Sequence, residues 1–310
     1  MKRKVVFICG ALRSGSSLTH LMLDHHPEIK NPGEFDFLFD QVADNGELPR
    51  IDSYHQWLAL HRIFQSKQLS VDPLLSYADL TQSFIEQLSQ PNSVLALNIH
   101  RGFDRIPFLC PDAKFIHLIR DPRDVAKSSI GMGWAGNVYY GIDHWLDTEL
   151  AWKRLQAKIL PEQYFELKFE DLILSPETVL KELCLFIAVP YSEKMFNYVD
   201  ESTYSQPDPS LVRQWKTKLT IREVQYVESK AQKLMSELGY DASGYPLIFI
   251  GPIERFWLKV SNKLFKMKFA IKRYGFSLYC KERISRFLKL ESLNNQARLM
   301  INKVDQQYLK

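Results

Sequence analysis

The sequence predicts a three-layer α/β fold in which helices cover both faces of a central, mostly parallel sheet. Short apolar runs rich in β-branched residues alternate with helical patterns over about the first 240 residues, and this alternation is typical of such sheets. The first run leads into a loop with Gly10 and Gly15, and then into a helical pattern. A strand, a glycine loop and a helix in this order make the predicted fold P-loop-like.

The strands of this sheet are predicted from apolar runs. Residues 4–8, 94–99 and 114–119 form three such runs, and residues 163–169 are a fourth candidate. Runs that are apolar almost throughout are typical of strands buried on both faces. The sequence therefore predicts at least three parallel strands in the core.

Helices are predicted in the segments between the strands. Leu18, Leu21 and Met22 form an i, i+3, i+4 apolar face directly after the glycine loop. Helical stretches within residues 52–89 predict a helical cap, at about residues 35–90, over one side of the sheet.

Two further helices are expected at residues 175–189 and 220–240, each after a Ser or Thr N-cap with acidic residues in the first turn. The segment 241–246 then interrupts the helical pattern, so we place a boundary near residue 245. It divides a domain at 1–245 from a basic, helical C-terminal extension at 246–310.

The composition is that of a globular protein, with a formal net charge of +4 over 310 residues. Residues 255–289 contain eleven Lys or Arg and one acidic residue, Glu282, so the rest of the chain carries about −6. A mildly acidic body does not favour nucleic-acid binding. Four widely spaced cysteines suit a reducing compartment. Their spacing also argues against a Cys-based zinc site, so we expect no metal there. With no run long enough to span a bilayer, we expect a cytoplasmic protein.

The glycine loop departs from the Walker pattern, in which a lysine follows the second glycine. Here Ser16 occupies that position, and Arg13 lies inside the loop instead. Arg13 and the hydroxyl groups of Ser14, Ser16 and Ser17 would surround the N-terminus of the following helix, where backbone amides and the helix dipole favour an anion. The loop suits a sulfate or phosphate group, although a glycine turn with a purely structural role has the same pattern.

A second motif begins at Arg120, which ends the predicted strand at 114–119. In open α/β sheets, ligand contacts lie at these strand ends. Asp121 is expected to be the N-cap of the next helix, and Ser128 lies about two helical turns after Arg120. The alternative is a surface charge network of Arg120, Asp121, Arg123 and Asp124.

Together the two motifs resemble the sulfotransferases that use 3′-phosphoadenosine 5′-phosphosulfate (PAPS), in particular their bacterial and tyrosylprotein-type branch. The resemblance covers about residues 4–240. It implies that the loop Arg13, Ser14, Gly15, Ser16 and Ser17 holds the 5′-phosphosulfate and that Arg120 and Ser128 hold the 3′-phosphate. It also implies a metal-free reaction.

The chain departs from the family pattern at several positions. Leu18 replaces the Trp that stacks on adenine in many cytosolic members, and Phe169 replaces the Tyr of the Tyr-Glu-Asp-Leu segment. The Arg-Lys-Gly element of the cytosolic members is absent. Arg213, in the segment VRQWK, is a further candidate for binding the donor.

Two residues compete for the role of general base. Glu34 follows the first helix in NPGEF, where the resembling branch has a Gly-Glu motif. His100 ends the second strand and matches the Lys-x-His element of cytosolic members, with Asn98 in place of the lysine. We favour Glu34 as the base, while each residue also has an ordinary structural explanation.

The resemblance implies transfer of a sulfuryl group to an acceptor, most simply a hydroxyl group of a sugar, lipid, peptide or small molecule. A kinase related to P-loop proteins and a catalytically silent nucleotide-binding module remain alternatives. The basic segment 255–289 is either a solvated helix packed on the body or a peripheral contact with a membrane or a partner. Acceptor identity and oligomeric state stay open.

Overall fold

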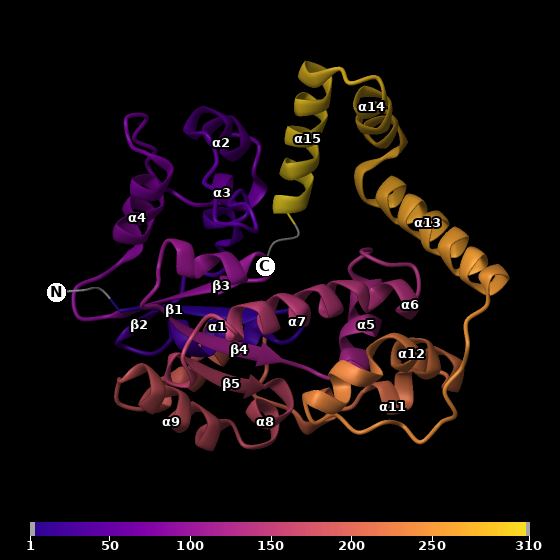
Figure 1. Cartoon of the computed structure of the whole chain (residues 1–310), viewed down its shortest axis with the longest axis horizontal. Helices are drawn as coiled ribbons and strands as arrows, with labels where there is room; N and C mark the ends of the chain where they lie inside the picture. The colour runs from indigo at the N-terminus through magenta and orange to yellow at the C-terminus, as the bar shows by residue number, and fades with distance from the viewer. Residues whose placement is uncertain (1–3, 308–310) are drawn as a thin grey trace.

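The computed structural model describes residues 4–307, and its core is the predicted parallel sheet between helices. Five strands lie in the order β2-β3-β1-β4-β5 (Figure 1). They are β1 (Val5–Gly10), β2 (Ile29–Lys30), β3 (Val94–Ile99), β4 (Lys114–Ile119) and β5 (Tyr164–Lys168). Because β1 is central and the strand order reverses around it, the loop after β1 opens at the edge where α/β proteins bind ligands.

All four predicted strands are present, and one strand was not predicted. The first strand extends to Gly10, two residues beyond the apolar run. Strand β2 has only two residues, which pair with Val94 and Leu95 of β3. A strand of this length has no hydrophobic pattern that a sequence could reveal.

The two faces of the sheet are covered by different helices. Val6 and Ile8 of β1 face a core built with α1 (Ser16–Asp24), α8 (Phe169–Leu174) and α9 (Pro176–Ile187). Phe7 and Cys9 alternate with them and face a core that includes α4 (Tyr77–Leu88) and α7 (Asp143–Gln156). This alternation follows from the period of two along a strand.

Residues 35–88 form the predicted cap, with α2 (Ile51–Leu58), α3 (Arg62–Ser66) and α4. Buried aromatic side chains hold it together and join it to the sheet. Phe37 packs edge-on against Phe64 and Phe84 within the cap, and the Tyr54 hydroxyl donates to the carbonyl oxygen of Phe37 at 2.9 Å. Phe39 packs edge-on against Phe7 of β1, with 5.5 Å between the ring centroids, so the cap is anchored on the sheet.

A third core lies beside the carboxyl edge of the sheet, between α5 (Pro122–Gly131), α6 (Val138–Gly141) and α12 (Ile221–Glu237). Asp121 caps α5 as predicted, and Thr220 caps α12 with a capping box. Ser175 occupies the N-cap position of α9, but its side chain makes no capping hydrogen bond, and Pro176 begins that helix.

The C-terminal segment forms three helices, α13 (Pro252–Tyr274), α14 (Phe276–Phe287) and α15 (Glu291–Gln306). They extend away from α12 and return toward the cap, as the orange-to-yellow arm of Figure 1 shows. Asn137 Nδ2 donates to the Leu258 carbonyl oxygen at 2.8 Å near the start of this arm, and Asn302 Nδ2 donates to the Leu60 carbonyl oxygen at 3.1 Å near its end. Within residues 4–307, no helix has the length and apolar composition needed to cross a bilayer.

Candidate functional site

The glycine loop turns sharply between β1 and α1. The Ser14 amide donates to the Ala11 carbonyl oxygen at 3.1 Å, and Arg13 has a φ of 75°. Gly15 has a φ of +100°, and a Cβ built there would lie 2.2 Å from Cδ2 of Phe169. Glycine is required here both by the backbone conformation and by the ring beneath it.

The N-terminus of α1 is open to a ligand. Gly15 is its N-cap, and no side chain of the described residues caps the helix. The first amides of an α-helix have no partner within the helix. Those of α1 therefore remain available for an anion at the positive end of the helix dipole.

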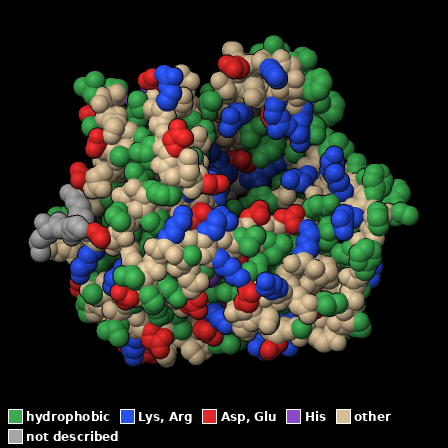
Figure 2. All heavy atoms as spheres, viewed as in Figure 1, with side chains coloured by type: hydrophobic (Ala, Val, Ile, Leu, Met, Phe, Trp, Pro, Cys, Tyr) green, Lys and Arg blue, Asp and Glu red, His purple; other side chains and the backbone are tan. Residues whose placement is uncertain are grey.

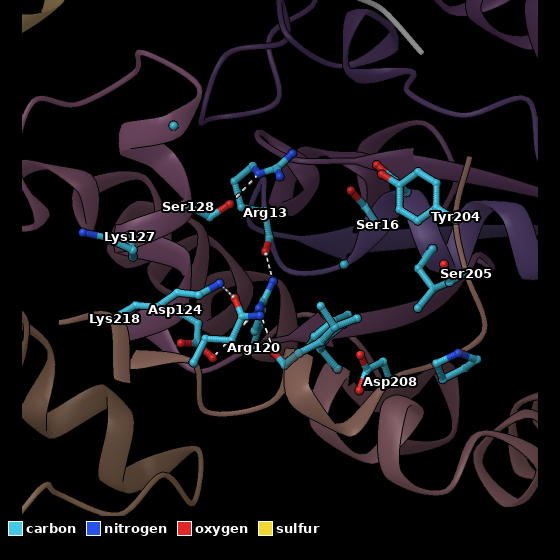
Figure 3. Close-up of a pocket in the computed structure, with 18 of the residues that line it drawn as sticks. Arg13, Ser16, Arg120, Asp124, Lys127, Ser128, Tyr204, Ser205, Asp208 and Lys218 are labelled. Atoms are coloured by element: carbon cyan, nitrogen blue, oxygen red, sulfur yellow. Dashed lines mark hydrogen bonds and ion pairs between the residues drawn. The ribbon is translucent and has the colours of Figure 1, made fainter. Parts of the chain in front are cut away.

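The two predicted motifs meet through direct hydrogen bonds. Arg13 Nε donates to Ser128 Oγ at 2.9 Å, and Arg120 Nη1 donates to the Arg13 carbonyl oxygen at 3.2 Å. Figure 3 shows both arginines with Ser128 and Ser16 around one opening. The Arg120 guanidinium also lies over the Phe169 ring, 4.3 Å from its centroid. Residues that are 107 positions apart in the chain therefore build one site.

These residues line a cavity of about 750 Å³, which we call the donor cavity. Its volume lies in the range of small-molecule sites. Of the residues predicted to bind the donor, its wall contains Arg13, Gly15, Ser16, Ser17, Arg120, Ser128 and Phe169.

Two predicted donor residues do not line this cavity. Ser14 is fully buried, because the tight turn at Ala11 directs its side chain inward. Arg213 is exposed and has a φ of 55°, whereas its neighbours Leu211, Gln214 and Trp215 line the wall. The structure thus places both side chains outside the wall of this cavity, and a donor contact by either residue stays a prediction.

The alternative of a surface charge network also fails for the second motif. Arg123 is buried and pairs with Asp121 at 2.7 Å and with Glu228 at 2.8 Å. These pairs fix the start of α5 beneath the cavity. Arg120 remains in the cavity wall, and Asp124 Oδ2 lies 3.9 Å from its Nη2 atom.

Several cavity residues were not predicted. Lys127 and Lys218 add two cations to the wall, and Asp124 accepts a hydrogen bond from the Trp215 amide at 2.6 Å. Burial raises the pKa of Asp124 to about 6, although Arg120 acts in the opposite direction. Residues 203–208 form another part of the wall. That segment has no motif from which its place could be inferred.

A second cavity, of about 540 Å³, lies on the other side of the glycine loop. We call it the acceptor cavity, because Glu34, the residue predicted to take the acceptor proton, lines it. It shares Arg13, Ser16 and Ser17 with the donor cavity. A group bound at the N-terminus of α1 is therefore accessible from both cavities.

The two candidate bases are neighbours. Glu34 Oε1 lies 3.7 Å from His100 Nε2, and the side chains are 39% and 3% exposed. Glu34 lines the acceptor cavity, whereas His100 lies behind it. His100 Nδ1 donates to the Gly10 carbonyl oxygen at 2.8 Å, which leaves Nε2 unprotonated in the neutral ring and directed toward Glu34.

The chain is similar to known sulfotransferases. A family model described as "Sulfotransferase family" matches residues 5–193. The sulfotransferase domain of the Synechococcus PCC 7002 olefin synthase has a TM-score of 0.57 at 20% identity and covers 78% of this chain and 97% of that one. The sulfotransferase domain of the curacin biosynthetic pathway has a TM-score of 0.55 at 20% identity, over 77% and 98% of the two chains. These likenesses agree with the observed fold.

The relatives found by sequence are 24–26% identical to this chain over the matched residues. Protein-tyrosine sulfotransferase 1 of Danio rerio is 24% identical over 78% of this chain and 74% of its own length. A putative protein-tyrosine sulfotransferase of Caenorhabditis briggsae is 24% identical over 63% and 69%. An uncharacterized protein of Aquifex aeolicus is 26% identical over 63% of this chain, and the match spans 27% of that relative's length.

Proposed function

Because the chain belongs to the sulfotransferase family, we propose that it transfers a sulfuryl group from PAPS to a hydroxyl group of an acceptor. One observation carries this proposal: two cavities of ligand size meet at Arg13, Ser16 and Ser17. A transferase needs two substrates with their reacting atoms side by side. The loop is the wall through which they would meet.

In the donor cavity, three of the four cations would bind the two charged ends of the donor. Arg120 and Lys127 would bind the 3′-phosphate together with the Ser128 hydroxyl, and Arg13 with the amides of α1 would bind the 5′-phosphosulfate. These charge-assisted hydrogen bonds suit phosphate and sulfate oxygens. The loop lacks the lysine with which P-loop enzymes bind the β- and γ-phosphates. For this reason we prefer PAPS to a nucleoside triphosphate.

In the reaction, the acceptor oxygen forms a bond to sulfur while the bond from sulfur to the 5′-phosphate oxygen breaks. The hydroxyl proton moves to Glu34, and 3′-phosphoadenosine 5′-phosphate (PAP) leaves. Glu34 is the better base because it lines the acceptor cavity, whereas His100 is buried behind it. Arg13 would stabilise the negative charge that develops on the leaving phosphate.

The proposal is tested by binding and by turnover. We expect PAP to bind at micromolar or lower Kd and more tightly than ATP with Mg²⁺, as measured by calorimetry. Incubation with labelled PAPS and acceptor extracts should yield a sulfated product that Glu34→Gln and Arg13→Ala fail to form. Tighter binding of ATP would support the kinase alternative instead. If PAP binds but no extract yields a sulfated product, the result would support the catalytically silent module.

One surface favours a peripheral contact with an anionic membrane. Ile253, Phe256, Trp257 and Leu264 form an exposed apolar stripe on α13, opposite the face on which Phe265 and Phe269 pack against the body. Lysines flank this stripe, including Lys259, Lys263, Lys268 and Lys272. An exposed apolar stripe with flanking lysines is typical of helices that lie on anionic lipid.

Liposome flotation tests this contact. We expect the protein to float with vesicles containing phosphatidylserine and not with vesicles of phosphatidylcholine alone, and Trp257→Ser with Phe256→Ser should abolish flotation. The double variant Leu185→Ser with Leu160→Ser, at exposed sites elsewhere, is the matched control. No difference between the two lipid compositions would remove the membrane contact. Cytoplasmic location stays a prediction.

A further inference from the structure

The acceptor cavity is closed by the C-terminal helices. Phe269 and Ala270 of α13, Arg283 of α14 and Arg298 of α15 line it on the side opposite the glycine loop. The cap contributes residues 60–63 to the same wall. The C-terminal extension therefore forms part of the site, beyond the region that the family model matches.

The extension is held in this position at both ends. Asn262 Oδ1 of α13 accepts from the Gly136 amide at 2.6 Å, and a Cβ built on Gly136 would lie 2.6 Å from Cβ of Phe265. On α15, Asp305 pairs with Arg62 of the cap at 3.5 Å and with Arg273 of α13 at 2.9 Å. The helices thus form a fixed wall over the cavity.

Cations dominate the charge of this wall. The lining contains seven cationic side chains and three carboxylates, a net charge of about +4 without His61. The cations are Arg13, Arg62, Arg101, Lys266, Arg273, Arg283 and Arg298, and the carboxylates are Glu34, Asp36 and Asp305. Figure 2 shows Lys and Arg side chains gathered around the hollow between the C-terminal helices and the body.

Two of the three carboxylates are already engaged by the protein. Asp36 is buried, and its carboxylate accepts hydrogen bonds from the backbone amides of His100 and Arg101. Asp305 is engaged by Arg62 and Arg273, as described above. Glu34 is left for the acceptor hydroxyl.

The same comparison for the cations shows that some of them have no close carboxylate partner among the described residues. Arg101 forms a bidentate ion pair with Asp40, with two contacts of 2.7 Å each. In contrast, no carboxylate of residues 4–307 lies within ion-pair distance of Lys266 or Arg298. Among the carboxylates of that part of the chain, Arg283 has one within ion-pair distance, Glu282 at 3.8 Å.

The pKa of His61, which lines the same cavity, reflects the positive charge of this wall. Burial lowers the pKa of His61 to about 4, and the charges of Arg101, Arg62 and Arg298 act in the same direction against Asp36. Like charges that converge on one cavity repel each other. A bound anion would remove this repulsion.

We propose that the acceptor carries an anionic group, a phosphate, sulfate or carboxylate, beside the hydroxyl that is sulfated, and that Lys266, Arg283 and Arg298 bind this group. This inference rests on the proposed function, because it treats the second cavity as the acceptor site. A cavity of about 540 Å³ has room for a small molecule or a lipid headgroup. The wall provides Glu34 at the reacting end and the three cations at the C-terminal end.

The test uses the full chain saturated with PAP, so that the donor cavity is occupied. Binding of three anionic hydroxyl compounds (glucose 6-phosphate, glucuronate and glycerol 3-phosphate) is compared with that of the neutral glucose and glycerol by calorimetry. A second arm compares vesicles that contain phosphatidylinositol phosphate with vesicles of phosphatidylcholine and with vesicles that contain phosphatidylserine at the same surface charge, because α13 is proposed to bind any anionic membrane. Preference for a soluble anion identifies a metabolite-like acceptor, and preference confined to phosphatidylinositol phosphate over both other lipids identifies a lipid headgroup.

Matched variants separate the cavity from general charge. Lys266→Gln and Arg298→Gln should each weaken binding of the preferred anion about 10- to 100-fold, the effect of one charge-assisted contact. Lys289→Gln and Lys303→Gln remove the same charge from exposed positions in the C-terminal segment that line neither cavity, and they should leave binding unchanged. PAP affinity should be equal in all four variants, which also shows that they are folded.

The proposal is overturned if no anionic probe binds better than its neutral counterpart, or if the cavity variants behave like their controls. Either result with normal PAP binding would refute only the anionic acceptor. Failure of PAP to bind the unmodified protein would refute the proposed function itself.

Discussion

Substitution of Gly15 by alanine should destabilise the protein by about 2–5 kcal/mol. A φ of +100° places Gly15 outside the conformations that L-residues prefer, and such a position costs an alanine about 1–2 kcal/mol. The added Cβ would also lie 2.2 Å from the Phe169 ring. Relief of overlap in a packed core costs about 1–3 kcal/mol more. The sum is a large share of the stability of a typical domain, about 5–15 kcal/mol.

Urea denaturation at pH 7 measures this change in the free energy of unfolding. Gly131→Ala is the matched control, because Gly131 is helical and a Cβ there meets no atom within 4 Å. We expect that control to be neutral or to gain up to about 1 kcal/mol. In Gly15→Ala with Phe169→Leu, the overlap should be relieved and the backbone strain retained. A loss below about 1 kcal/mol for Gly15→Ala would refute the argument from the loop geometry.

Three further predictions concern the donor cavity and the core. Arg120→Ala should weaken PAP binding about 10- to 100-fold but leave binding of adenosine 5′-phosphate, which lacks the 3′-phosphate, within about threefold; equal losses for both ligands would contradict the assignment. Burial raises the pKa of Asp124 to about 6, so this carboxyl group gains a negative charge as the pH rises from 5 to 7. PAP affinity should fall over that range, because the new charge repels the phosphates, and the fall should be smaller in Asp124→Asn. In the core, burial lowers the pKa of His117, but Glu149 and Glu166 outweigh it, and the net shift is upward. Stability should therefore be highest below about pH 6.5 and decline as the pH rises through the raised pKa, and His117→Gln should flatten this profile in urea titrations between pH 5.5 and 8.5.

The sheet and the glycine loop could be predicted because their signals are local. Apolar runs mark the strands, and Gly15 and Arg120 stand directly after two of them. Parallel strands bring their carboxyl ends to one edge, so the meeting of the two motifs follows from the topology. Spacing in the sequence does not predict the direction in which a side chain points in a tight turn. Ser14 points inward for this reason, while Ser16 and Ser17 line both cavities.

The acceptor cavity was harder to predict, because its walls come from segments without a motif. Residues 60–63, Lys266 and Arg298 meet there only through the return of α15 to the cap. The basic character of 255–289 was visible in the sequence. Whether those cations face solvent or a cavity depends on the turns between α13, α14 and α15, which no pattern specifies.

Hydrogen bonds link the two motifs that are predicted to bind the donor, so that a shift in one is transmitted to the other. Arg13 is held through its side chain by Ser128 and through its carbonyl oxygen by Arg120. A phosphate that draws Arg120 or Ser128 toward itself therefore also moves the group that would stabilise the leaving phosphate at the other end of the donor. For this reason binding at the ribose end and chemistry at the sulfate end should be coupled. Loss of the Ser128 hydroxyl should lower kcat as well as donor affinity, whereas a residue that only binds the 3′-phosphate would change affinity alone.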